Sequence, residues 1–317
     1  MLHRHTLPLL DFDLYANGNS QEKSKFVQQL GMAFEEIGFV AIKNHYLSEK
    51  VESVLYQETK FFFNLPREVK MKYCIENLAG QRGFTPFGVE RAKDANQGDL
   101  KEFWHFGQYV PDEIKKDFTY PANIEVKEIP AFNEVGEKSF KLLEKTGKIL
   151  LQAIAEYLRL DKHYFDKFVV NGNSILRPIF YAPITKDPQT AVRAGQHEDI
   201  NLITLLMGAS AQGLQILDKH NKWQAITTGK GEMVINVGDM LQRLTNNKMK
   251  STTHRVINPP KEKWGEPRYS IPFFLHPIAN MPLNCLSNCM DADGQKKYDD
   301  ITAGEYLIQR LKEIGLA

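Results

Sequence analysis

The alternation of apolar and polar residues divides the chain into a helix-rich first half and a strand-rich second half. Over residues 20–37, apolar side chains recur three or four positions apart, which places them on one face of an α-helix. Ser20 can cap the start of this helix, and Gly38 can end it by adopting a left-handed backbone conformation. The apolar run over residues 39–42 that follows predicts a short buried strand.

Similar patterns predict further helices. Apolar spacing indicates a second helix over residues 48–64, and Pro66 suits the first turn of a third, because the amide hydrogen that proline lacks has no partner there. The longest helical pattern runs from residue 137 to residue 160. An amphipathic pattern over residues 301–316 predicts a C-terminal helix.

After about residue 173 the chain changes to short apolar runs separated by Gly, Asn, Asp and Pro. The runs are SILRPIFYAPI, NLITLLMG, GLQILD, KWQAIT, EMVINVGD, STTHRVIN and RYSIPFFLHP. Short strands in one continuous half favour a β-sandwich or barrel over a fold in which strands and helices alternate. The sequence therefore predicts a mixed α/β protein of the α+β type, in which helices pack around a β core.

The chain is predicted to form four regions of one cooperative unit. An N-terminal helix-rich region is followed by a long supporting helix, a β core and a C-terminal helix, and we found no internal repeat. The expected boundaries are 1–125, 126–172, 173–280 and 281–317.

Composition and charge exclude several classes of partner. The chain has 317 residues, of which 42% are hydrophobic and 25% are charged, as in soluble globular proteins. Its net charge of +1 gives no general attraction to nucleic acid or to anionic lipid. No run approaches the roughly 18 to 20 apolar residues of a membrane helix, and the first residues are too broken for a secretory signal.

The cysteines fit a reducing compartment. Cys74, Cys285 and Cys289 are too few, and odd in number, for a disulfide framework. We therefore expect a cytoplasmic protein that has neither nucleic acid nor membrane as a partner. We also expect a monomer, because no coiled-coil pattern and no exposed apolar helix is present.

The stretch GQHEDI, at residues 195–200, offers half of a metal site. On a strand, His197 and Asp199 project from the same face, and Glu198 points the other way. A later β-rich run supplies His254. Two imidazoles and one carboxylate with open coordination positions form the ligand set of non-haem Fe(II) oxygenases. Taken alone, however, a His-x-Asp pair is more often two polar residues on a solvated strand.

A second pair of polar residues strengthens the metal hypothesis. Arg268 and Ser270 in EPRYSIPFF also share one strand face, where a guanidinium and a hydroxyl can bind the same carboxylate. A buried arginine is costly unless an anion balances its charge. A dicarboxylate co-substrate that binds the metal at one end and Arg268 at the other would account for both pairs. The alternative is an exposed strand arginine.

The order of these motifs resembles the isopenicillin N synthase-like branch of the Fe(II)/2-oxoglutarate-dependent dioxygenases. The matching stretches follow the family order over nearly the whole chain, and they are LPLLDF, AFEEIGFVAIKNH, FFNLPREVKMKY, GQHEDINLITLL, GLQ, INVGDMLQRLTNNKMKSTTHRVINP and RYSIPFF. The resemblance implies a distorted double-stranded β-helix, a cupin-like jelly roll, over residues 173–280. Helices would flank this core, and iron would lie inside its open end.

The resemblance also assigns roles to individual residues. It places the Fe(II) ligands at His197, Asp199 and His254, and the distal carboxylate of 2-oxoglutarate at Arg268, Ser270 and Tyr181. The stretch around Tyr181 reads Ile-Phe-Tyr-Ala-Pro, whereas plant members usually read Asn-Tyr-Tyr-Pro-Pro. The missing asparagine removes one polar contact near the co-substrate.

Aromatic stretches are expected to line the substrate side of the site. The expected residues are Arg82, Phe84, Phe103 and Phe273. Aromatic walls with one arginine would suit a small amphipathic substrate that carries a carboxylate. Core packing of the aromatic rings and a solvated Arg82 are the alternative. His105 fits a packed or exposed histidine better than a fourth metal ligand.

The reaction implied by the resemblance consumes O2 and 2-oxoglutarate at Fe(II) and releases succinate and CO2. Hydroxylation of a small molecule is the expected outcome, and desaturation or ring closure remains open. One alternative is an oxidase of the same fold that does not use 2-oxoglutarate, although the C-terminus LKEIGLA lacks the penultimate glutamine of isopenicillin N synthase. Another is a metal- or ligand-binding protein without catalysis.

Overall fold

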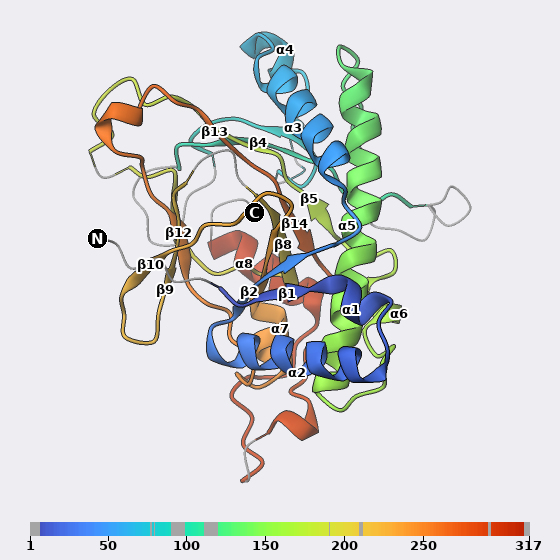
Figure 1. Cartoon of the computed structure of the whole chain (residues 1–317). Helices are drawn as coiled ribbons and strands as arrows, with labels where there is room; N and C mark the ends of the chain where they lie inside the picture. The colour runs from blue at the N-terminus through green and yellow to red at the C-terminus, as the bar shows by residue number, and fades with distance from the viewer. Residues whose placement is uncertain are drawn as a thin grey trace.

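The computed structural model describes residues 7–76, 78, 80–89, 99–110, 120–189, 191–208, 212–290 and 293–313. Within these residues the strands form three sheets, and α2, α3 and α5 gather beside them (Figure 1). This arrangement confirms the predicted mixed α/β class. No helix in the described part of the chain is long and apolar enough to cross a membrane.

The predicted helices form, with shifted ends. Asn19, rather than the predicted Ser20, caps α2, because its side chain accepts from the amides of Gln21 and Glu22. Gly38, with φ of 76°, ends this helix region as expected. The helices are α1 (Phe12–Ala16), α2 (Ser20–Glu36), α3 (Glu49–Phe63), α4 (Arg67–Met71), α5 (Pro130–Tyr157), α6 (Asp166–Val169), α7 (Asp239–Leu244) and α8 (Ala303–Glu313), with 3-10 turns η2 (Lys261–Lys263) and η3 (Ser287–Cys289).

The largest sheet combines strands from both halves of the chain. Its order is β1-β2-β11-β8-β14-β5, in which β1 and β2 are parallel and the other pairs are antiparallel. The N-terminal strands β1 and β2 therefore add to a sheet whose other strands all come from the second half of the chain. The bounds are β1 (Leu9–Asp11), β2 (Phe39–Lys43), β5 (Ile175–Leu176), β8 (Ile203–Met207), β11 (Met233–Val237) and β14 (Pro272–Leu275).

Two four-stranded sheets carry the polar motifs. One has the order β10-β9-β12-β7 and the other β13-β6-β4-β3. All the apolar runs predicted as strands in the second half form strands, whereas β3 and β4 lie in aromatic stretches for which no strand was predicted. The bounds are β3 (Gly83–Thr85), β4 (Glu102–His105), β6 (Ile179–Tyr181), β7 (Ala194–His197), β9 (Leu214–Leu217), β10 (Trp223–Ala225), β12 (His254–Val256) and β13 (Arg268–Ser270).

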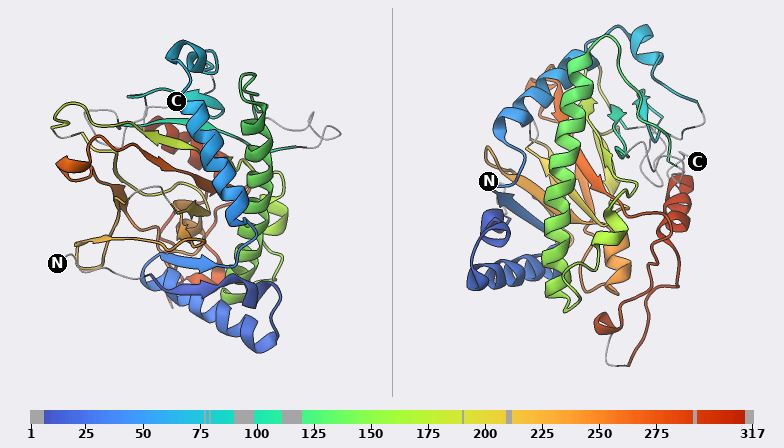
Figure 2. Two further views of the ribbon diagram at one scale, coloured as in Figure 1. Left: turned by 45° about the horizontal axis from the view of Figure 1, so that its top comes forward. Right: turned by 90° about the vertical axis from the view of Figure 1, so that its right-hand side faces the viewer.

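The two faces of the largest sheet have different partners. Leu205 on β8 packs toward α5, where a Cβ added to Gly147 would lie 3.4 Å from its side chain. Its neighbours Thr204 and Leu206 line a cavity on the other face, as strand alternation requires. In the second view of Figure 2, α5 runs alongside the strands for much of the length of the molecule. One face of the sheet therefore belongs to the core, and the other is available for chemistry.

Candidate active site

Three metal-binding side chains converge where β7 meets β12. The two strands are antiparallel neighbours, and His254 lies directly opposite His197. The Nε2 atoms of His197 and His254 lie 3.9 Å and 3.7 Å from Oδ1 of Asp199. One donor atom from each residue lies within 4.8 Å of the others. The structure therefore brings together the three residues that the sequence nominated as metal ligands.

Hydrogen bonds orient both imidazoles toward one point. Nδ1 of His197 lies 2.7 Å from the carbonyl oxygen of Gly195, and Nδ1 of His254 lies 3.1 Å from that of Thr252. A carbonyl can only accept, so each Nδ1 carries the proton and donates it. Each Nε2 therefore keeps its lone pair for a metal ion.

The carboxylate of Asp199 is held in the same way. Its Oδ2 accepts a hydrogen bond of 2.6 Å from the hydroxyl of Thr204 and one of 2.8 Å from the amide of Asn236. Both donors lie on the large sheet, on β8 and β11. Oδ1 is the oxygen that faces the two imidazoles. The donor set thus fits a divalent metal ion that prefers mixed nitrogen and oxygen ligands.

The electrostatics of the cluster favour the protonation states that metal binding requires. Burial lowers the pKa of the His197 imidazole to about 4, and the nearby His254 acts in the same direction. Burial alone would raise the pKa of Asp199, but His254, His197 and the two hydrogen bonds hold it below its usual value. A neutral imidazole and an ionised carboxylate can both donate electron pairs to a metal ion.

The prediction that His197 and Asp199 lie on one strand is wrong. β7 ends at His197, so Asp199 lies beyond the strand, where its carbonyl oxygen accepts from the amide of Asp239 at 2.7 Å. Glu198 turns its carboxylate to the hydroxyl of Thr253, at 2.8 Å. Although the cavity reaches Glu198, this carboxylate is not one of the clustered metal donors. His197 and Asp199 therefore converge while the Glu198 carboxylate points elsewhere, but no continuous strand links the three, and Glu198, which was expected to face outward, still borders the cavity.

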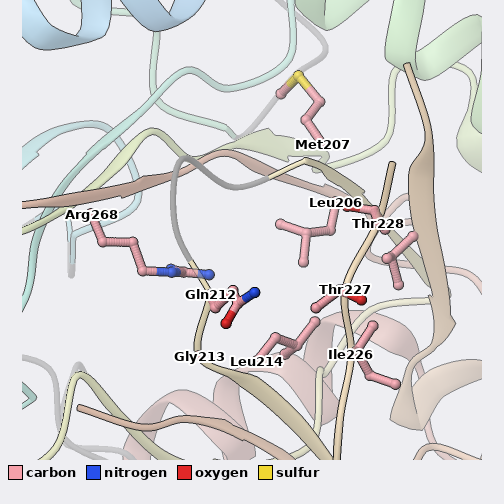
Figure 3. Close-up of a pocket in the computed structure, with 10 residues that line it drawn as sticks. Leu206, Met207, Gln212, Gly213, Leu214, Ile226, Thr227, Thr228 and Arg268 are labelled. Atoms are coloured by element: carbon pink, nitrogen blue, oxygen red, sulfur yellow. The ribbon is translucent and has the colours of Figure 1, made fainter. Parts of the chain in front are cut away.

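A cavity of about 430 Å³ joins the metal donors to the second polar pair. Arg268 and Ser270 are buried on one face of β13, and Tyr181 lies opposite Arg268 on β6 with its ring centroid 5.0 Å from the guanidinium carbon. All three line this cavity. Arg268 also borders a smaller cavity of about 140 Å³, into which its side chain points alongside Gln212 and Leu214 (Figure 3).

The structure does not bring Arg82 to the cavity wall. Arg82 is buried and donates to the carbonyl oxygens of Pro121, at 3.0 Å, and Gln81, at 2.6 Å. Burial lowers its pKa to about 10. Its guanidinium lies against Gly107, where an added Cβ would be 1.8 Å from it. Through these contacts, Arg82 links its own segment to the segments that contain Gly107 and Pro121.

The three phenylalanines expected on the substrate side also lie behind the wall. The ring of Phe84 packs 6.0 Å from that of Phe62, and the ring of Phe273 packs 5.0 Å from that of Phe140 on α5. Phe103 lies closer to the site, with its ring centroid 4.5 Å from the guanidinium carbon of Arg177. None of the three is among the described residues that line the cavity.

Several cavity residues were not identified from the sequence. Arg177 and His276 line the cavity next to the large sheet, whereas Phe274 of β14, which also lines it, belongs to an aromatic stretch that the sequence did place on the substrate side. Leu307, Arg310 and Leu311, spaced as neighbours on one face of α8, line it from the C-terminal helix. The C-terminal position that was compared with the penultimate glutamine of isopenicillin N synthase lies outside the described residues.

Comparisons with known proteins agree with this geometry. The profile of the 2OG-Fe(II) oxygenase superfamily matches residues 172–277, and the N-terminal profile of the non-haem dioxygenases in morphine synthesis matches residues 7–128. The 2-oxoglutarate-Fe(II) type oxidoreductase hxnY of Emericella nidulans is 30% identical over 96% of this chain and 89% of its own length.

Solved structures show the same likeness. A 2OG-Fe(II) oxygenase family protein from Caulobacter crescentus is 42% identical, with a TM-score of 0.85 over 99% of this chain and all of its own. A Neurospora crassa protein, solved in complex with alpha-KG and thymine, is 28% identical, with a TM-score of 0.85 over 96% of each chain. The sequence resemblance is therefore confirmed, and the chain belongs to the 2OG-Fe(II) oxygenase superfamily.

Proposed function

We propose that this chain hydroxylates a small amphipathic molecule, with Fe(II) held by the three clustered donors and 2-oxoglutarate held by the Arg268 pair. The observation that carries the proposal is the single cavity that both sets of residues line. Its volume of about 430 Å³ falls in the range of small-molecule sites. The thymine complex of the Neurospora relative supports a small-molecule substrate.

In the proposed reaction, one C–H bond of the substrate, one 2-oxoglutarate and one O2 are converted to one C–OH bond, one succinate and one CO2. When bound, Fe(II) supplies the centre at which O2 oxidises the 2-oxo acid and then the substrate. One oxygen atom enters succinate and the other enters the substrate. The outcome is hydroxylation, unless the substrate geometry diverts it to desaturation or ring closure.

The residues of the chain bind and orient the reactants. Arg268 donates from its planar guanidinium to the distal carboxylate of 2-oxoglutarate, and the hydroxyls of Ser270 and Tyr181 donate to the same group. These three line the wall on one sheet, and the metal donors line it on another. A 2-oxo acid bound between them would be fixed at both ends, which orients it for reaction.

We also propose that the three sheets close into the distorted double-stranded β-helix of the family, as one cooperative unit that acts as a monomer. The TM-scores of 0.85 with two family structures support this arrangement. Pairing of the N-terminal β2 with β11 supports the single unit, because the first region completes the sheet that carries Asn236.

Release of succinate in the absence of any added substrate tests the proposal. The protein with Fe(II), 2-oxoglutarate and O2 should form succinate slowly, and His197→Ala and Arg268→Gln should abolish this release. Arg243→Gln is the matched control for Arg268→Gln, because Arg243 is not among the described residues that line the cavity. Absence of both succinate release and 2-oxoglutarate binding would favour a family member that oxidises without this co-substrate.

A further inference from the structure

The side chain of His276 enters the cavity from the residue that follows β14. Alternation along this segment directs Phe274 and His276 to the cavity and Leu275, between them, into the hydrophobic core. The hydroxyl of Ser174 accepts from the amide of His276 at 3.2 Å and donates to its carbonyl oxygen at 3.3 Å. These backbone contacts fix the direction in which the imidazole points.

The imidazole of His276 is buried and unpaired. Only 7% of His276 is exposed, and its hydrogen bonds to other described residues involve the backbone alone. Nδ1 is completely enclosed, whereas Nε2 is not, so Nε2 is the ring nitrogen that a molecule in the cavity can reach. Because buried polar groups nearly always have hydrogen-bond partners, the unpaired ring indicates a group that a ligand completes.

The start of β14 lies toward the residues proposed for 2-oxoglutarate. Pro272, the first residue of this strand, pairs with Leu206 of β8. Leu206 borders both of the cavities that Arg268 lines. Pro272 also follows Ser270 by only two residues along the chain. One end of the strand is therefore the co-substrate end.

The metal donors lie level with the middle of the same strand. Phe274 pairs with Thr204, whose hydroxyl binds Asp199. His276 lies two residues further on, about 7 Å along the extended chain. The metal donors thus lie between the co-substrate end and His276. A molecule that contacts His276 can therefore bind beside the metal while 2-oxoglutarate is in place.

The protonation of the ring indicates what His276 can bind. Burial lowers the pKa of His276 to about 4, so the ring is neutral and has one N–H group and one bare nitrogen. An enclosed N–H group without an acceptor is rarer in proteins than an enclosed acceptor without a donor. The bare nitrogen is therefore assigned to Nδ1, and Nε2 donates into the cavity. A neutral donor balances no charge, which suits an uncharged acceptor.

We propose that Nε2 of His276 donates to a carbonyl oxygen of the substrate, and that the substrate is a small uncharged molecule with a carbonyl group and an apolar body. The side chains of Ile175, Phe274 and Leu307 offer apolar surface to that body in the same cavity. This inference rests on the proposed function, because it names the substrate class of the same site.

The first test needs no ligand. His276→Leu replaces the unpaired ring by an apolar side chain of similar size, so it should raise the melting temperature of the protein at pH 7.5 by about 1 to 4 °C. Thr245→Val is the matched control, because the hydroxyl of buried Thr245 donates to the carbonyl oxygen of Leu241 at 2.8 Å. This control should lower the melting temperature. A similar loss in His276→Leu would show that the ring is not unpaired.

The second test measures the hydrogen bond itself. Anaerobic calorimetry would use the Fe(II) protein saturated with 2-oxoglutarate, so that Arg268 is occupied. The probes are acetophenone, phenylacetone and 4-phenyl-2-butanone, each with the alkene in which a CH2 group replaces the oxygen. For at least one pair, the ratio of ketone affinity to alkene affinity should fall by about 5- to 100-fold in His276→Leu, because the alkene leaves the N–H group of the wild type unpaired.

Two further variants separate this effect from general damage. His276→Gln keeps an N–H donor on a longer side chain and should keep part of the wild-type ratio. His45→Leu changes a partly buried histidine that is not among the described residues lining the cavity, and should leave the ratio unchanged. If His276→Leu folds poorly, the stability expectation is contradicted, and His276→Met repeats the binding test.

Two binding results would overturn the assignment of His276. They are a ratio that is the same in the wild type and in the apolar variants, and no binding of any ketone to protein that binds 2-oxoglutarate. A titration of 2-oxoglutarate precedes each experiment and distinguishes the possible failures. If 2-oxoglutarate binds and the ratio does not depend on His276, only the carbonyl site is wrong. If 2-oxoglutarate does not bind, the proposed function itself fails.

Discussion

The hydroxyl of Thr204 donates a hydrogen bond of 2.6 Å to Oδ2 of Asp199, and so fixes which oxygen of that carboxylate faces the imidazoles. Thr204 is buried on β8, and its neighbours on that strand pack into the core. The large sheet therefore holds the carboxylate of Asp199 in place through this hydrogen bond from Thr204.

Thr204→Val should weaken metal binding by about 10- to 100-fold, because it keeps the shape of the side chain and removes the hydrogen bond that orients a ligand. Calorimetric titration of the metal-free protein with Fe(II) under anaerobic conditions measures the effect. Thr59→Val is the matched control, since Thr59 is a fully buried threonine of α3 whose hydroxyl has no hydrogen-bond partner among the described residues. Unchanged affinity in Thr204→Val would show that Thr204 does not orient Asp199.

Neutralising Asp199 or its neighbour Glu198 should change the Fe(II) affinity to very different extents. Asp199→Asn removes an ionised ligand and should reduce Fe(II) affinity by more than about 100-fold. Glu198→Gln keeps an oxygen that can accept from Thr253 and should change the affinity by less than about twofold. Equal losses in the two variants would contradict the assignment of side-chain directions in GQHEDI.

Gly107→Ala should destabilise the fold by about 1 to 3 kcal/mol, because the new methyl group overlaps the guanidinium of Arg82. Urea denaturation of the metal-free protein measures the free energy of unfolding. Gly265→Ala is the control, since an added Cβ there meets no described atom within 4 Å. A Gly107→Ala protein as stable as the wild type would mean that Arg82 moves easily and is not held as described.

His276 should make the fold sensitive to acid. Burial lowers the pKa of His276 from 6.5 to about 4, so its imidazole is neutral in the folded protein. The unfolded chain takes up a proton below its own pKa of 6.5, so stability is full above that pH and is lost as the pH falls toward 4. The expected loss is about 3 kcal/mol.

The comparison with His276→Gln isolates this contribution. The difference in unfolding free energy between about pH 7 and pH 4.5 should be smaller in the variant than in the wild type by roughly 2 to 3 kcal/mol. His220→Gln removes an exposed imidazole on the turn between β9 and β10 and should leave the wild-type difference intact. If the free energy of unfolding depended on pH in the same way in His276→Gln and in the wild type, the pKa of His276 would not be lowered by folding.

Local pattern predicted most strands, and the order of the motifs along the chain identified the family. His254 and Arg268 each lie in a short apolar run, and His197 lies at the end of β7 in the stretch GQHEDI. Thr204 and Asn236, by contrast, are ordinary strand residues. Their role depends on β8 and β11 pairing in one register, which no single segment specifies.

The substrate side could not be predicted because it depends on which face of a strand α5 covers. Phe273 and Phe274 are adjacent on β14 and point to opposite faces, one toward Phe140 of α5 and the other into the cavity. The same limit applies to the arginines. Arg82 and Arg177 both lie near aromatic residues, but only the tertiary fold shows that Gly107 and a loop carbonyl bury Arg82.

The most direct test of the account is calorimetric titration of 2-oxoglutarate into the anaerobic Fe(II) protein. One molecule per chain should bind, and this binding should require the metal and be lost in His254→Ala. Arg268→Gln should weaken the binding by at least about 100-fold, because it removes a charge-assisted pair in a buried site. Binding that is absent in the wild type, or that is equally tight without Fe(II) and in Arg268→Gln, would contradict the account.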